Sequence, residues 1–359
     1  MRCSVIILNW NGEKWLEKFL PTVVKYTVTT DCEVVVADNG STDGSIELLK
    51  QFPFVRVIRF EENYGFAEGY NRALQQTTAD YTVLLNSDVE VTQGWLTPLL
   101  DYMDAHEDVA AVQPKILKYT SPQPSPKERE DMDSTVQDPI SKGDIPHFEH
   151  AGAAGGYIDM FGYPYCRGRI IGYVEEDKGQ YDDTAEVFWA SGACMCVRTR
   201  IFKECGGLDA GFFAHMEEID MCWRLQCRGF KAACVPSSVI YHVGGGALDY
   251  ENPRKVYLNF RNNLLMLYKN LPANRLWWVM ACRFILDYTA LLQSLVTGKT
   301  KNAKAIIEAR RDYRKMRRSA EYKAKRKENM RLAIIKFPDI IYRGSIVLRY
   351  YLGKRTMTE

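Results

Sequence analysis

The sequence predicts an α/β fold with a mostly parallel sheet, and three segments of similar design support this prediction. Each is an apolar run of strand character that ends on Asn or Asp: residues 4–8 before Asn9, 33–37 before Asp38, and 81–85 before Asn86. The first two lead into predicted helices at 13–26 and 45–51. Strands that alternate with helices at this spacing indicate βαβ units and therefore a parallel sheet.

The segment Tyr81–Asp88 is the most informative of the three. Residues 81–85 have the continuous apolar character of a buried parallel strand, so Asn86, Ser87 and Asp88 are expected at its carboxyl end. Open α/β sheets bind ligands at that edge, where Asp88 could hold a divalent cation. An Asp at a strand end can also cap the next helix, and the motif alone leaves both interpretations open.

The remaining elements follow in order along the chain. We predict a helix at 93–105 and strands at 109–117 and 232–240, with a loop and a helix at 209–228. Residues 120–147 are rich in Ser, Pro, Lys, Glu and Asp and bury too little apolar surface to order themselves, so we predict a flexible insertion. It is either a tolerated surface loop or a cover for the substrate.

The character of the chain becomes helical after residue 250. The apolar stretch 271–296 is interrupted by Arg275, Arg283 and Asp287, and its uncharged runs are shorter than the roughly 18–20 residues of a spanning helix. We expect either an interfacial helix on an anionic membrane or a helix packed on the α/β domain or in a dimer. The predicted domains are therefore 1–250, α/β, and 251–359, a basic amphipathic helical region.

Charge and cysteine content limit the partners and the compartment. The formal net charge is +2, but residues 299–331 contain fourteen Lys and Arg against four Asp and Glu. Aromatic residues are sparse there and no zinc or helix-turn-helix signature accompanies them, so we expect no nucleic-acid partner. Ten cysteines without a CxxC pair, and no signal peptide before the first strand, indicate reduced thiols in a cytoplasmic protein.

Several motifs together resemble family 2 glycosyltransferases of the GT-A fold, a Rossmann-like α/β fold, and most closely their bacterial rhamnosyltransferase-like branch. They are SVIILNWNG, VVVADNGSTDGS, NYGFAEGYNRAL, YTVLLNSD, ASGACMCVR, HMEEIDMCWRL and VIYHVGGG, which run from the amino terminus to about Gly246. The resemblance implies transfer of a sugar, with rhamnose from dTDP-rhamnose the first candidate, to a saccharide or polyprenyl-diphosphate-linked acceptor. Galactose, galactofuranose and N-acetylhexosamine donors stay open, because pocket shape decides between them.

The resemblance also implies site residues. Those on the nucleotide side are Asn9, Asn11, Asp38, Asn39, Asn63, Gly65, Phe66, Asn71, Asn86 and Ser87, and those on the sugar and acceptor side are Trp189, Ser191, Gly192, Ala193 and Arg224. The small residues of the second group allow a backbone to approach a ligand closely, although tight packing is the competing explanation. Arg224 either steers the diphosphate or pairs with neighbouring acids.

A departing diphosphate requires positive charge, and the resemblance assigns Asp88 and His242 to a Mg²⁺ or Mn²⁺ site. Asn86 stands where the first acid of the family's Asp-x-Asp motif is common. For His242 a structural role is the alternative.

Three acids, Glu217, Glu218 and Asp220, gather at the start of a predicted helix. By position in the family's motif Glu218 is the catalytic base, although Asp is usual there. Crowding is expected to raise the pKa of one carboxyl group, which suits a base, whereas acids at a helix start can also merely compensate its dipole. A single base implies inversion at the anomeric carbon.

Two other functions were weighed. A nucleotidyltransferase would carry a Gly-rich phosphate loop with Lys or Arg after the first strand, which Asn9-Trp10-Asn11-Gly12 lacks. A lectin-like protein without catalysis would have no need for Asp38, Asp88, Glu218 and His242 together.

Overall fold

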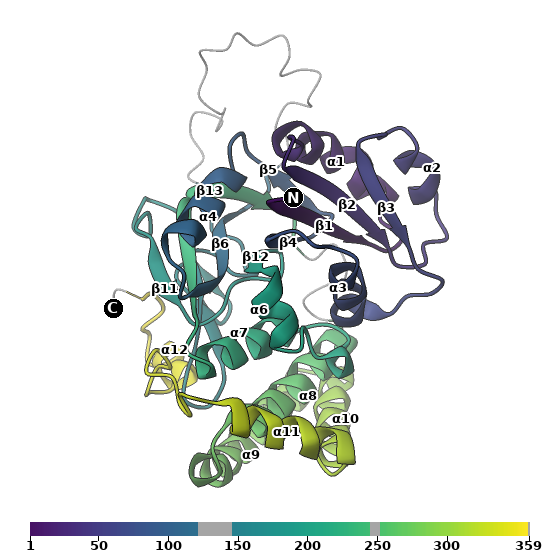
Figure 1. Cartoon of the computed structure of the whole chain (residues 1–359). Coiled ribbons are helices and arrows are strands. Elements are labelled where there is room, and N and C mark those ends of the chain that lie inside the picture. Colours follow the sequence, from purple (N-terminus) through teal and green to yellow (C-terminus); the bar gives the residue numbers. More distant parts are fainter. Residues whose placement is uncertain (121–145, 245–251, 358–359) are drawn as a thin grey trace.

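The computed structural model describes residues 1–120, 146–244 and 252–357 (Figure 1). The predicted insertion at 120–147 therefore lies almost entirely outside the described residues, as do the glycines 245 and 246.

The described residues form a nine-stranded sheet with the order β11-β13-β6-β12-β4-β1-β2-β3, in which β5 also pairs with β13. Its strands are β1 (Cys3–Asn9), β2 (Cys32–Asp38), β3 (Val55–Arg59), β4 (Tyr81–Leu85), β5 (Val89–Val91), β6 (Val109–Lys118), β11 (Ala185–Val187), β12 (Cys194–Arg198) and β13 (Lys231–His242). Strands β4, β1, β2 and β3 are parallel, as are β6 and β13, whereas β12 runs antiparallel between β4 and β6. The predicted α/β class with a mostly parallel sheet is confirmed.

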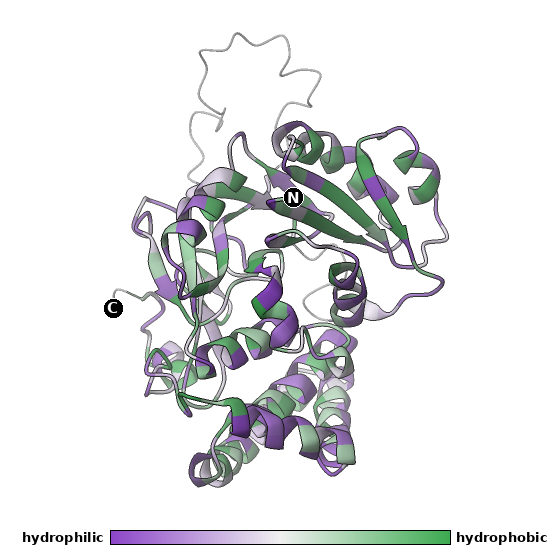
Figure 2. Ribbon diagram, viewed as in Figure 1, coloured by the Kyte–Doolittle hydropathy of each residue, from purple (hydrophilic) through white to green (hydrophobic). Residues whose placement is uncertain are grey.

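Side chains of each strand alternate between two apolar cores, one on either face of the sheet. In β1 and β2, Ile6 and Val35 enter one core and Val5 and Val34 the other. Both faces are therefore covered by helices, and the central strands β1, β2 and β4 are mostly apolar (Figure 2). The first core includes residues of α3 (Gly65–Gln75), α6 (Thr199–Glu204) and α7 (Glu217–Cys227), and the second those of α1 (Glu13–Thr27), α2 (Ser45–Leu49) and α4 (Leu96–Ala105).

A smaller antiparallel sheet contains β7 (Gly156–Ile158), β8 (Pro164–Cys166), β9 (Arg169–Ile170) and β10 (Tyr173–Val174). It follows β6 in the chain, and its edge meets the main sheet through a bridge between Gly156 and Trp189. This sheet was not predicted, because strands of two or three residues have no periodic pattern in the sequence.

The carboxyl-terminal region is helical, as expected, with α8 (Pro253–Asn270), α9 (Ala273–Val296), α10 (Thr300–Met316), α11 (Ala320–Leu332) and α12 (Ile346–Tyr351). Helix α8 lies beside α7 in Figure 1, and its residues Leu264 and Leu265 share one core with Ile219 and Trp223 of α7. The boundary at residue 250 remains a prediction. What the structure adds is that α8 packs directly on the α/β part.

Among the described residues, α9 is the one helix long and apolar enough to cross a membrane by length and composition. Its charged residues Arg283 and Asp287 are nevertheless buried inside the protein, where they pair with each other and with Arg310 of α10. An ion network that depends on α10 indicates that α9 belongs to the folded helical region.

Candidate active site

The polar residues that end the parallel strands meet at one edge of the sheet. Asn9 of β1 is in register with Asp38 of β2, and Asn9 Nδ2 donates a hydrogen bond to Asp38 Oδ1 at 3.2 Å. Both side chains are buried. This edge is the place where open α/β sheets bind ligands.

Ser41 fixes the turn that follows β2. Its backbone N–H donates to Asp38 Oδ2 (3.1 Å), and its hydroxyl accepts from Asn9 Nδ2 (3.2 Å) and from the backbone N–H of Asn11 (2.9 Å). Asn9 Oδ1 is buried and has no hydrogen-bond donor within the described protein. A Cβ at Gly12 would lie 2.3 Å from this atom, which explains the glycine.

Asn39 and Asn63 hold the second predicted nucleotide loop. Asn39 Nδ2 donates to Asn63 Oδ1 (3.0 Å), which also accepts from the N–H of Gly65 (2.8 Å). Gly65 has φ +77°, and a Cβ there would meet the ring of Phe213 at 2.5 Å. Phe66 donates its backbone N–H to Phe213 O (2.8 Å), so this loop is joined to the segment that precedes α7.

Asn71 does not open toward the site. Its side chain forms two hydrogen bonds with the backbone of Leu208, as donor at 2.8 Å and as acceptor at 2.9 Å. The predicted contact of Asn71 with ribose or diphosphate thus finds this side chain already engaged in holding α3 against the loop before η1 (Ala210–Phe212).

Asp88 and His242 come together although they are far apart in the chain. His242 Nε2 lies 3.1 Å from Asp88 Oδ1 and 3.4 Å from Asn86 Nδ2, and its Nδ1 lies 3.2 Å from Glu149 Oε2. Burial would lower the pKa of His242, but the carboxylates of Asp88 and Glu149 outweigh it and raise the pKa to about 10. Glu149 was not predicted as a site residue, because nothing in the sequence around it distinguishes it from other acids.

The donor set fits a divalent metal ion that is shared with a ligand. Asp88 offers a carboxylate, His242 an imidazole and Asn86 an amide, which are groups that Mg²⁺ or Mn²⁺ accepts. The described residues form no cluster of three or more His, Cys, Asp or Glu side chains ready to hold a metal by themselves. Further ligands must therefore come from a bound molecule such as a diphosphate, or from water.

Residues 190–193 connect this edge to the acidic helix. Asn86 donates its backbone N–H to Ala193 O at 2.9 Å, and a Cβ at Gly192 would lie 3.4 Å from Phe66 and 3.8 Å from the Cβ of Glu218. Ser191 and Trp189 are instead buried and bonded within the protein. The Ser191 hydroxyl donates to Ala151 O, and Trp189 Nε1 donates to Tyr157 O at 3.0 Å.

Glu217 and Glu218 begin α7, and in each the Oε2 atom is buried without a hydrogen-bond donor among the described residues. Burial raises the pKa of Glu218 to about 7. Burial and the neighbouring Glu218 charge raise the pKa of Glu217 well above its ordinary value. Glu218, the more exposed of the two, is therefore able to take up a proton near neutral pH.

The segment before α7 has an unusual backbone that α8 holds in place. Phe213, His215 and Met216 all have positive φ (65°, 69° and 72°), a region that costs energy for side-chain-bearing residues. Asn262 of α8 is completely buried, and its Nδ2 lies within hydrogen-bond distance of the carbonyls of Phe212 (3.0 Å), Ala214 (2.9 Å) and His215 (2.8 Å). We call residues 212–216 the α7 entry loop.

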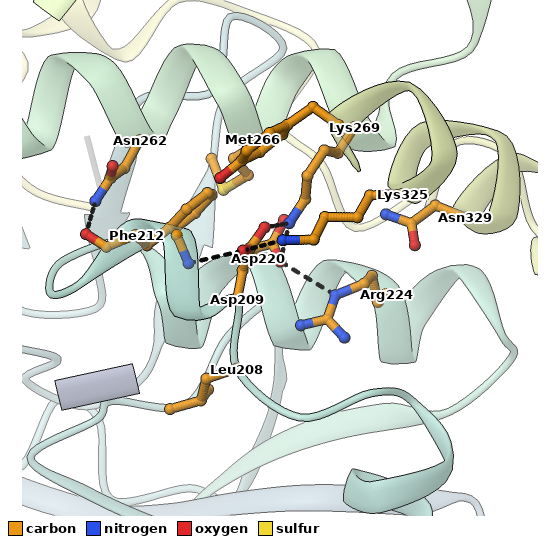
Figure 3. Close-up of polar contacts among 12 residues, drawn as sticks. Leu208, Asp209, Phe212, Asp220, Arg224, Asn262, Met266, Lys269, Lys325 and Asn329 are labelled. Carbon is orange, nitrogen blue, oxygen red and sulfur yellow. Dashed lines mark hydrogen bonds and ion pairs between the residues drawn. The ribbon is translucent and has the colours of Figure 1, made fainter. Parts of the chain in front are cut away.

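Asp220 and Arg224 belong to a buried ion network rather than to the edge of the sheet (Figure 3). Asp220 Oδ2 accepts from Lys269 Nζ (2.9 Å) and Arg224 Nε (3.1 Å), while Lys269 and Lys325 also bind Asp209. Burial alone would raise the pKa of Asp209, but the two lysines hold it well below its ordinary value. We call Asp209, Asp220, Arg224, Lys269 and Lys325 the α7–α8 ion network.

Arg224 is engaged within the protein. All its guanidinium contacts go to Asp220 and to the carbonyls of Cys205 and Gly207, the last at 2.6 Å, so it pairs with an acid and closes a loop. Asp220, predicted with the catalytic acids, points toward α8 (Figure 3), and at about 100° per residue it lies roughly 200° around α7 from Glu218.

Comparisons with known proteins agree with this architecture. Residues 4–163 match the family model "Glycosyl transferase family 2". A relative from Mycobacterium tuberculosis, N-acetylglucosaminyl-diphospho-decaprenol L-rhamnosyltransferase, is 26% identical over 302 residues, which are 81% of this chain and 91% of that protein.

Among solved structures, Staphylococcus aureus TarS 1–349 in complex with UDP-GlcNAc superposes with a TM-score of 0.54 at 15% identity and covers 99% of this chain and 93% of that one. GalNAc-T7 with UDP, GalNAc and Mn²⁺ gives a TM-score of 0.55 at 16% identity over 76% of this chain and 48% of that one. The matches confirm the predicted resemblance and the GT-A fold.

Proposed function

We propose that this chain, a glycosyltransferase of family 2 by the match of residues 4–163, transfers L-rhamnose from dTDP-rhamnose to a saccharide or lipid-linked acceptor in surface polysaccharide synthesis. The mycobacterial relative, named for L-rhamnosyl transfer to a decaprenyl-diphosphate-linked sugar, supports the choice of donor and acceptor. The observation that supports the proposal is the position of residues 192–193 between the two proposed groups: Ala193 O accepts from the N–H of Asn86, two residues before Asp88, and Gly192 lies next to the Cβ of Glu218.

The nucleotide side of the proposed site is the edge at Asn9 and Asp38. Asp38 accepts hydrogen bonds from the base or ribose, and Asn9 Nδ2 holds its carboxylate in place. Asp88 and His242 hold Mg²⁺ or Mn²⁺, with Glu149 orienting the imidazole ring from its other side. When bound, the ion supplies positive charge to the leaving diphosphate.

Glu218 is proposed as the catalytic base. Its carboxylate accepts the proton of the acceptor hydroxyl, whose oxygen forms a bond to the anomeric carbon while the bond from that carbon to the diphosphate oxygen breaks. The products are a glycoside and a nucleoside diphosphate. Because one displacement occurs without a covalent sugar–protein intermediate, the anomeric configuration inverts.

Release of nucleoside diphosphate from a panel of sugar nucleotides, with Mg²⁺ or Mn²⁺ present, tests the proposal. We expect the fastest release from dTDP-rhamnose and an inverted linkage by NMR of the product. Preference for a UDP-galactose, UDP-galactofuranose or UDP-N-acetylhexosamine donor would contradict the choice of sugar. Failure to turn over any donor would point to a binding protein, and release of pyrophosphate from a nucleoside triphosphate would point to a nucleotidyltransferase.

With a lipid-linked acceptor, the proposed place of work is the cytoplasmic face of the cell membrane, and the chain is expected to reach it as a peripheral protein. All cysteines of the described residues are free thiols, which is compatible with that compartment.

A further inference from the structure

The helices α9 and α10 form a hairpin in which α9 buries charged side chains and exposes apolar ones, the reverse of a soluble helix. On α9 the ionisable Arg283 and Asp287 are buried, while large apolar side chains are exposed along one stripe: Trp277, Phe284, Ile285, Leu292, Leu295 and Val296, at 46–88% exposure. At about 100° per residue these positions fall within an arc of about 120°, so they lie on one side of the helix. An exposed apolar stripe of this length marks an interaction surface.

The exposed surface of α10 is almost entirely basic. Its exposed large side chains are Lys301, Lys304, Ile307, Arg311, Arg314 and Lys315. The two acids of α10, Glu308 and Asp312, are only partly exposed, and they lie 3.9 Å from Lys304 and 3.0 Å from Arg311. Neither helix, both of them fully described, presents an acid of the exposed class.

The two exposed strips point to the same side of the molecule. Tyr288 and Leu291 of α9 pack against Ala303 and Ile306 of α10, and Arg310 lies over the ring of Phe284 at 5.1 Å. These residues mark the seam between the helices. An α-helix turns by about 100° per residue, so on each helix the exposed positions lie beside the seam and opposite the buried side. The strips together form what we call the outer face of the hairpin.

We propose that the outer face binds the surface of an anionic lipid bilayer, with the α9 stripe entering the headgroup region and the α10 cations lying over lipid phosphates. An apolar stripe beside a basic one is the pattern of interfacial helices. The choice of a bilayer as the partner rests on the proposed function, since a lipid-linked acceptor would be presented from such a bilayer.

A second copy of the chain is the competing occupant, and charge disfavours it. Packing two outer faces together would place the α10 cations against cations or against apolar side chains, and the two acids of α10, Glu308 and Asp312, are only partly exposed and already lie beside Lys304 and Arg311. A bilayer that contains acidic lipid supplies the missing negative charge.

Sedimentation with vesicles tests this inference without any sugar nucleotide, so its failure is separate from failure of the proposed enzyme activity. The full chain should sediment with vesicles of phosphatidylcholine and phosphatidylglycerol in equal parts, stay in solution with phosphatidylcholine alone, and be released by salt. Lys301→Gln with Lys304→Gln should lower the partition coefficient about thirtyfold.

The apolar contribution is tested with Ile285→Asp combined with Leu292→Asp, which should abolish sedimentation while donor hydrolysis in solution is unchanged. Phe54→Asp is the matched control, because Phe54 is 75% exposed but lies near β3, and it should bind vesicles like the unmodified chain. An unmodified chain that ignores acidic vesicles overturns the inference. A double-Asp variant that still binds acidic vesicles also overturns it. The inference fails as well if the unmodified chain is a dimer that does not bind vesicles and the double-Asp variant is a monomer.

Discussion

Replacing Asp220 by Asn tests whether this acid is structural, in contrast to Glu218, the proposed catalytic base on the same helix. Asp220 is completely buried, and its carboxylate accepts from Lys269, Arg224 and Asn270, the last at 2.8 Å. Glu218, two residues earlier, lies at the edge of the sheet. The replacement keeps the shape of the side chain and removes its charge.

The size of the effect follows from these distances. At an effective dielectric constant of about 20, charges separated by the 2.9 Å between Lys269 and Asp220 attract by about 6 kcal/mol. The carboxylate also regains hydration on unfolding, so removing one member of a buried pair costs about 3–5 kcal/mol. We expect a loss near the middle of this range, about 4 kcal/mol. With about 2 cal/mol/K of unfolding entropy per residue over 359 residues, Tm falls by about 5 °C.

Guanidinium unfolding gives the stability, and steady-state turnover well below Tm gives the activity of the folded fraction. Asp220→Asn should shift the unfolding midpoint strongly and leave kcat within a few-fold. Asp101→Asn is the control for removing a carboxylate, since Asp101 forms only an exposed ion pair with Arg2 and should cost less than about 1 kcal/mol. A variant with unchanged stability and a turnover reduced by orders of magnitude would refute the reasoning and place Asp220 in the chemistry.

Three further predictions concern the site itself. Glu218→Gln should lower kcat by about 10²-fold or more while donor affinity is retained. In the unmodified protein, kcat/KM should fall about tenfold per pH unit below pH 7, since only deprotonated Glu218 accepts a proton. A kcat/KM that does not change below pH 7 would exclude Glu218 as the base. The pKa of Glu218 is higher in the folded than in the unfolded protein, so the contribution of Glu218 to stability is present at low pH and lost as the pH rises through about 7. Thermal unfolding at pH 8 should therefore show Glu218→Gln to be more stable than the unmodified protein by up to about 3 kcal/mol. Asp88→Ala or excess EDTA should abolish transfer, and full activity in EDTA would show that the ion is dispensable. Asn262→Ala should lower the free energy of unfolding by about 2–3 kcal/mol and lower kcat without changing the KM for the donor. The control Asn263→Ala loses hydrogen bonds to Gly162 and Arg283 instead, and it should lose stability but keep kcat. Equal kcat in the two variants would show that the α7 entry loop does not position Glu218.

Much of the fold was readable from local pattern. The predicted helix at 13–26 is observed at Glu13–Thr27, and the predicted strands at 109–117 and 232–240 at Val109–Lys118 and Lys231–His242. Apolar runs identify buried strands because both faces of this sheet are covered. The predicted helix at 93–105 starts three residues late, at Leu96, because Thr92 to Trp95 form a turn with Gly94 at φ +73°.

The site was predictable only where a side chain ends a strand. Asp38, Asp88 and His242 follow apolar runs, and the topology then brings them to one edge. Glu149, Asn262 and Lys269 gave no such signal, because their partners lie tens of residues or more away in the chain. The same long-range pairing explains why Asp220, Arg224 and Asn71 were grouped with ligand-binding residues although their polar atoms are engaged within the protein.

The hold of α8 on the entry loop limits how the chain can be divided or recombined. Residues 1–244 contain every proposed chemical group, yet the backbone that presents Glu218 adopts three unfavourable φ values under contacts from Asn262. A chimera that exchanges the helical tail with that of a relative would therefore need a matching asparagine and lysine on the new helix. The position of the proposed base is thus inherited as one unit with the helical tail.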